Sequence, residues 1–126
     1  MIAPRLEDLV IWQLADEIRR RVHEISATPD IARDFKFRDQ LRDAASSIPR
    51  NIAEGFGRYR HGEFAQFLFI ARGSLFELRD ILRDGRSRRL LNEKSVKEID
   101  WLCVRTRIGM TRLIRYLKTT PDRNEW

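Results

Sequence analysis

The chain has 126 residues and a formal net charge of +6, carried by 21 Arg and only 4 Lys against 19 acidic residues. With 42% hydrophobic and 35% charged residues, the composition indicates one globular domain and excludes a disordered chain. A single cysteine excludes a disulfide framework, and no apolar run reaches the ~20 residues of a membrane span. Acidic residues interrupt the N-terminal segment where a signal peptide needs apolar ones, so we expect a cytoplasmic protein that forms one domain over residues 1–126.

Hydrophobic residues recur at helical spacing in four segments, which predicts amphipathic helices over residues 6–26, 34–56, 61–83 and 93–118. Pro29 disfavours a helical conformation at the residue before it and ends the first helix. Pro49 lies inside the second helix and removes a backbone donor, so a kink or a local break is expected there. No segment alternates like a strand. The predicted fold class is all-α, an antiparallel up-and-down four-helix bundle.

The third and fourth predicted helices carry apolar residues on a second face, away from the expected core. A second apolar face usually means a second packing partner, and a short chain finds that partner most simply in another copy of itself. The alternative is a wide core that takes in Phe69 and Phe76. The candidate residues for an oligomer interface are Phe69, Gly73, Phe76, Trp101, Ile108 and Tyr116.

Arginines cluster around the turn before the third helix, in the connector after it and along the fourth helix. Arg binds phosphate through two parallel hydrogen bonds and stacks on bases, so these clusters are candidates for nucleic-acid contact. They are also explained by an ordinary solubilising surface, by the favourable interaction of cations with the C-terminal end of a helix, or by genomic base composition. The candidates are Arg50, Arg58, Arg60, Arg86, Arg88, Arg89, Arg105, Arg112 and Arg115.

No constellation of catalytic or metal-binding residues is present. His23 and His61 are the only imidazoles, and neither has the spacing of a metal site. Cys103 falls on the apolar face of the fourth helix, where an inert core thiol is expected rather than a nucleophile. We therefore expect no enzymatic activity, no catalytic residue, no metal and no cofactor.

A stripe of polar and small residues runs beside the core face of the second helix and meets the third. Such residues allow close helix packing and can hydrogen-bond across the seam or to the carbonyl that Pro49 frees. A buried structural network is favoured over a ligand site. Its expected members are Gln40, Ser47, Asn51, Glu54 and Ser74.

The run QLRDAASSIPRNIAEGFGRYRHGEFAQFLFIARGSLFEL, residues 40–78, closely resembles the central signature of the 23S ribosomal RNA intervening-sequence protein family. The opening LEDLVIWQLADEI is similar to the first helix of that family, with Leu9, Trp12 and Gln13 in its pattern. Three features depart from the family: Asp43 stands where Arg is common, the connector DGRSRRLL is unusually basic, and the last helix matches only in character.

The resemblance implies a four-helix bundle that assembles as a ring, a homopentamer. It also implies kinship with the accessory proteins of diversity-generating retroelements, which associate with a reverse transcriptase and nucleic acid. No catalytic residues come with it. We therefore expect a non-enzymatic oligomeric accessory protein that associates with RNA or DNA, with a reverse transcriptase or another protein as a further partner and no contact with membranes. The alternative is a protein-interaction scaffold that binds no nucleic acid itself.

Overall fold

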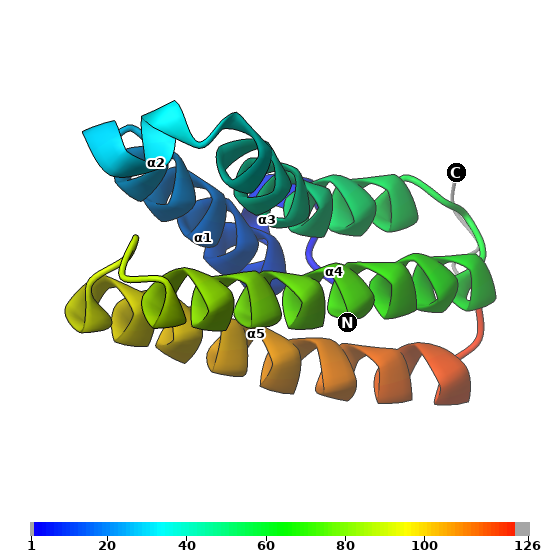
Figure 1. Ribbon diagram of the computed structural model, residues 1–126. Coiled ribbons are helices and arrows are strands. Elements are labelled where there is room, and N and C mark those ends of the chain that lie inside the picture. The colour runs from blue at the N-terminus through cyan, green and yellow to red at the C-terminus, as the bar shows by residue number, and fades with distance from the viewer. Residues whose placement is uncertain (1, 123–126) are drawn as a thin grey trace.

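The computed structural model describes residues 2–122, and these residues contain helices and no β-strand (Figure 1). Met1 and residues 123–126, which the predicted domain includes, lie outside the described part. A short 3-10 helix precedes the first α-helix. The elements are η1 (Leu6–Asp8), α1 (Val10–Ser26), α2 (Pro29–Arg33), α3 (Phe35–Phe56), α4 (His61–Ser87) and α5 (Glu93–Thr119).

The four long helices form a closed set of antiparallel neighbours, with α3 between α1 and α4, and α5 between α4 and α1. Figure 1 places the α3–α4 turn and the last turn of α5 at one end, and the α4–α5 connection at the other. The antiparallel direction is visible in single contacts. Arg21 at the end of α1 lies 3.3 Å from Glu98 near the start of α5. The predicted antiparallel packing of four helices is therefore present in the described chain.

The core lies between these four helices and is built from the apolar residues that recur at helical spacing. Most of the large side chains of the core are less than 2% exposed. The largest side chains below this value are Ile18, Ile31, Leu41, Ile48, Ile52, Phe64, Leu68, Leu75, Leu78, Leu82, Ile99 and Met110. Among the described residues no helix is long and apolar enough to cross a membrane.

Two boundaries differ from the prediction. The first α-helix begins at Val10 rather than at residue 6, because Leu9 is extended and separates it from η1. The segment after Pro29, expected as a turn, forms the one-turn helix α2. Proline suits the first helical position, where its fixed φ matches the helix and its missing N–H has no partner to lose.

The third long helix continues past its predicted end at residue 83 to Ser87. Gly85 lies in this extra turn, and a Cβ there would come within 2.6 Å of the Phe37 ring and 2.8 Å of Leu91. Its lack of a side chain lets α4 approach α3 and the connector closely, so this glycine serves packing and does not end the helix. The chain turns at Arg89, which adopts a positive φ of 60°.

Pro49 does not break α3, which is continuous from Phe35 to Phe56. The expected local break is therefore wrong, and the kink stays a prediction. Pro49 is buried, and the packing of its ring in the core offsets part of the cost of the backbone hydrogen bond that is lost there. The Asn51 amide donates to the carbonyl oxygen of Ser47 at 2.8 Å and not to the Ala45 carbonyl that the proline deprives of its usual donor.

Candidate nucleic-acid interface

Arg58, at the α3–α4 turn, forms ion pairs and a ring contact with residues of the same chain. Its Nη2 lies 2.8 Å from Glu54 Oε1, and its Nη1 lies 3.6 Å from Glu63 Oε1. The guanidinium also lies over the ring of Phe67, 4.9 Å from the centroid. These contacts occupy the charge and one face of the group, so Arg58 is a poor candidate for contact with nucleic acid.

Arg88, after the end of α4, is engaged in the same way. Its Nη2 lies 2.7 Å from Asp34 Oδ2, its Nη1 lies 3.5 Å from Asp84, and its guanidinium covers the Phe37 ring. Asp34 caps α3 by accepting a hydrogen bond from Phe37 N at 3.1 Å. That hydrogen bond, together with the one from Arg88, holds the pKa of Asp34 below its usual value. The Arg88–Asp34 ion pair therefore joins the connector after α4 to the start of α3.

The remaining predicted arginines do not form one patch. Arg86 and Arg89 lie at the α4–α5 connection, whereas Arg60 precedes α4 and Arg50 lies near the end of α3. The 27 residues of α4 span about 40 Å at 1.5 Å per residue, so Arg60 and Arg86 lie at opposite ends of the bundle, and Arg50 lies between those ends. The candidate arginines therefore lie in separate places on the bundle and along α5, as the separate clusters in the sequence indicate.

The arginines of α5 divide between two grooves. Arg105 and Arg112 line the groove between α1 and α5, and Arg115 lines the groove between α5 and α4. All three are exposed, and none has an ion pair within residues 2–122. Their charge is therefore available to a ligand or to another protein.

The α4/α5 groove gathers cations around an exposed aromatic ring. Phe69 is 38% exposed; Arg72 Cζ lies 5.3 Å and Lys118 Nζ 5.0 Å from its ring centroid. Arg115 lies in the same groove, and no acidic side chain lines it. Arg72, Arg115 and Lys118 form no ion pair with any described residue. We call the surface formed by Phe69, Arg72, Arg115 and Lys118 the Phe69 groove.

Sequence reasoning left Arg72 and Lys118 out of the candidate site. Arg72 follows Phe69 by three residues, so helical spacing alone places the two side chains together. Lys118 comes from another helix and reaches the ring only through the antiparallel packing of α4 on α5, which has no signal in the local sequence.

The predicted interface residues are mostly exposed. Phe76 is 49% exposed, Trp101 62% and Ile108 40%, and a Cβ on Gly73 would meet no atom within 4 Å. The alternative of a wide core that encloses Phe69 and Phe76 is therefore wrong, because both rings are exposed. Tyr116 differs, because it is partly buried against the core and its ring lies 6.1 Å from that of His61. The prediction also omitted Ile70, which is 49% exposed on α4.

The polar network contains three of its five expected members. Ser47 Oγ and Ser74 Oγ lie 2.8 Å apart across the α3/α4 seam, and Asn51 donates to Ser47 Oγ at 3.0 Å. Gln40 is exposed and outside this cluster, and Glu54 is exposed and paired with Arg58.

Cys103 and His61 are buried in the described chain, whereas His23 on α1 is partly exposed. Burial raises the pKa of the Cys103 thiol to about 12, which leaves it protonated and unreactive. His61 is buried at the start of α4, where its backbone N–H donates to Asp122 and its Nδ1 lies 2.9 Å from the Thr120 carbonyl oxygen. Among residues 2–122 no group of three or more His, Cys, Asp or Glu side chains is placed to hold a metal ion.

The model of the family described as 23S rRNA-intervening sequence protein matches residues 7–110. The chain belongs to this family. The match includes α1 to α4 and most of α5, so it takes in Phe69, Arg72 and Arg105 but not Arg115 or Lys118. A search among curated proteins finds no match. Membership in the 23S rRNA-intervening sequence family accounts for the run of residues 40–78 on which the resemblance was based.

Proposed function

We propose that the protein is a non-enzymatic, oligomeric accessory factor that binds single-stranded RNA along the Phe69 groove. The observation that carries the proposal is the ring of Phe69 with Arg72 and Lys118 against it, Arg115 beside it, and no acidic side chain to neutralise these cations. Cations supply phosphate contacts, and an exposed ring supplies a stacking surface for a base.

The helix dipole explains only part of this cluster. Cations in the last turns of α5 interact favourably with the partial negative charge at its C-terminal end, which accounts for Lys118 and helps to account for Arg115. Arg72 lies in the middle of α4, where the dipole gives no such benefit. The convergence of two helices on one ring therefore favours an anionic, base-bearing ligand over a purely structural origin.

Oligomerisation strengthens the proposal. A ring of subunits, a pentamer by the family resemblance, repeats the groove once per subunit and multiplies weak contacts through avidity. We place this assembly in the cytoplasm, in association with a reverse transcriptase or another RNA-handling protein. The family description supports an RNA context without naming a ligand.

The test is the affinity for a fluorescent single-stranded RNA, measured by anisotropy at several salt concentrations. The variant R72Q/R115Q/K118Q removes three charges from the groove, and K36Q/K94Q/K97Q removes three exposed charges elsewhere as the matched control. We expect the groove variant to bind at least tenfold more weakly, with a salt dependence shallower by about two, because each phosphate contact on a single strand contributes about 0.7 to the slope. Equal losses in both variants would contradict the assignment of the groove.

A second candidate function is that of a protein-interaction scaffold, and the α1/α5 groove favours it. Val10, Leu14 and Ile108 line this groove together with Arg105 and Arg112, which suits a protein surface with apolar and acidic side chains. Recovery of one protein partner after nuclease treatment, together with no affinity for RNA, would favour the scaffold over the RNA-binding factor.

A further inference from the structure

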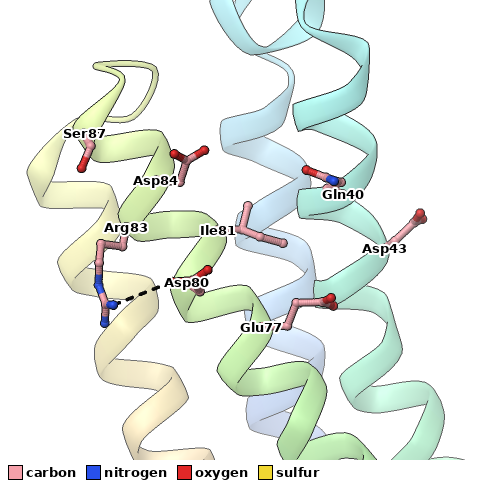
Figure 2. Close-up of a pocket in the computed structure, with 8 residues that line it drawn as sticks. All are labelled: Gln40, Asp43, Glu77, Asp80, Ile81, Arg83, Asp84 and Ser87. Carbon is pink, nitrogen blue, oxygen red and sulfur yellow. Dashed lines mark ion pairs between the residues drawn. The ribbon is translucent and has the colours of Figure 1, made fainter.

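The side of α4 that faces α3 is acidic, in contrast to the Phe69 groove. Figure 2 shows Asp43 on α3 and Glu77, Asp80 and Asp84 on α4 around one shallow groove. Asp43 and Glu77 form no ion pair within residues 2–122. Asp80 lies 3.7 Å from Arg83, and Asp84 lies 3.5 Å from Arg88. All four side chains are at least 46% exposed, so these two ion pairs neutralise little of the acidic charge.

Three of these acids belong to a row that runs along the outside of α4. Ile70, Gly73, Glu77, Asp80 and Asp84 follow one another at alternating steps of three and four residues, which places them on one stripe of the helix. All five are exposed. The stripe begins with an apolar residue and an open glycine and ends in three acids. We call it the acidic row.

A second row with the same alternating steps runs along the outside of α5. It consists of Trp101, Arg105, Ile108 and Arg112, all of them exposed. Trp101 is 62% exposed, an unusual position for a tryptophan in an isolated subunit. Arg105 and Arg112 have no ion pair among the described residues. We call this stripe the arginine row.

We propose that the acidic row of one copy packs against the arginine row of a second copy. Two helices pack along stripes with steps of three and four residues, and both rows have this spacing. Their charges are opposite, and Gly73 leaves room for a large side chain such as Trp101 to approach α4. The inference rests on the self-association in the proposed function and specifies the surfaces that produce it.

The charges also select the symmetry of the contact. A two-fold contact of α4 with α4 brings acids against acids, and one of α5 with α5 brings arginines against arginines, so both are disfavoured. The contact between unlike rows is heterologous. It leaves the arginine row of one copy and the acidic row of the other free to bind further copies. Such contacts form a ring where the rotation between copies closes and an open filament where it does not. Arg105 and Arg112 are then interface residues, and Arg115, on the other edge of α5, stays with the Phe69 groove.

The test is the molar mass in solution, by light scattering or sedimentation, of charge-reversal variants. E77K/D80K and R105E/R112E each place like charges in the contact, so each alone should be monomeric. A 1:1 mixture of the two should associate again, as should the chain with all four substitutions, because each restores opposite charges. E24K/E93K and K36E/K94E reverse matched exposed charges elsewhere and should keep the wild-type mass. All substituted residues are exposed, so every variant is expected to fold, and circular dichroism checks this.

The outcomes separate the two levels of the proposal. A monomeric wild-type chain would overturn self-association itself. An oligomer whose mass survives both reversals, or dissociates with only one of them, would overturn the pairing of the rows while self-association stands. Dissociation by each reversal without recovery in the four-substitution chain or in the mixture would also overturn it.

Discussion

The two sides of α4 differ in how completely they are packed. Toward α3 the seam is closed: Gly55 allows the backbone to approach Phe64 and Phe67, and Ser47 and Ser74 satisfy each other across it. Toward α5 the rings of Phe69 and Phe76 stay 38% and 49% exposed, with guanidinium groups over them. The helix α4 is therefore closely packed on the side that faces α3. On the side that faces α5 it keeps aromatic rings exposed to solvent in the single chain.

This difference separates what the fold needs from what is left for function. The α3/α4 seam uses small and hydrogen-bonded residues, so its sequence is explained by stability alone. The α4/α5 edge places apolar rings and unpaired cations in solvent, which stability of one subunit does not explain. Substitutions in the seam should therefore change the free energy of unfolding, and substitutions at the edge should change binding.

The largest effect on stability is expected at Gly55. A Cβ at this position would lie 2.8 Å from Phe64 Cδ1 and 2.9 Å from Phe67 Cβ, so Gly55→Ala should lower the free energy of unfolding by about 1–3 kcal/mol. Gly62→Ala is the control, because a Cβ there meets no atom within 4 Å. Chemical denaturation measures both. Equal stability of the two variants would show that the seam is not tightly packed.

Phe69 is expected to matter for RNA and not for the fold. Loss of a ring that stacks on one base costs about 1–3 kcal/mol, so Phe69→Ala should weaken RNA binding by roughly 5- to 150-fold. Phe76→Ala is the matched control, since this ring is at least as exposed as Phe69 (49% against 38%) but lies under Arg79, which is paired with Asp100 at 2.7 Å. Anisotropy titrations compare them. Similar losses in both variants would place the ligand along the whole edge.

The hydrogen bond across the seam should give a smaller effect. A double-mutant cycle with Ser47→Ala and Ser74→Ala should yield a coupling free energy of about 0.5–1.5 kcal/mol, as expected for a half-buried neutral hydrogen bond. A coupling near zero would mean that water replaces the contact.

The smallest effect concerns pH. The pKa of Asp34 is held below its usual value, so its stabilising contribution is present above about pH 4 and is lost as the pH falls through the folded-state value. Asp34→Asn keeps a side-chain oxygen for the cap but has no charge to titrate. The free energy of unfolding of the wild type should therefore fall more steeply below pH 4 than that of the variant. Parallel curves would contradict this reading.

Much of the fold could be predicted, since helical periodicity marks every long helix and Pro29 marks the end of the first. The extra turn of α4 could not, because Gly85 reads as a helix end until Phe37 and Leu91 are seen against it. The sequence predicted that arginines form the candidate site, but it did not predict which of them lie together in the structure. Local sequence locates each arginine, but it does not show that Arg58 and Arg88 are paired or that Lys118 crosses to Phe69.

The central claim is that different surfaces bind RNA and join subunits, and one sample tests it directly. The chain with E77K, D80K, R105E and R112E together should have the wild-type molar mass and bind single-stranded RNA within about threefold of the wild type, because its contact charges are exchanged and its Phe69 groove is intact. An assembled chain of this kind that has lost RNA binding as fully as R72Q/R115Q/K118Q would contradict the claim.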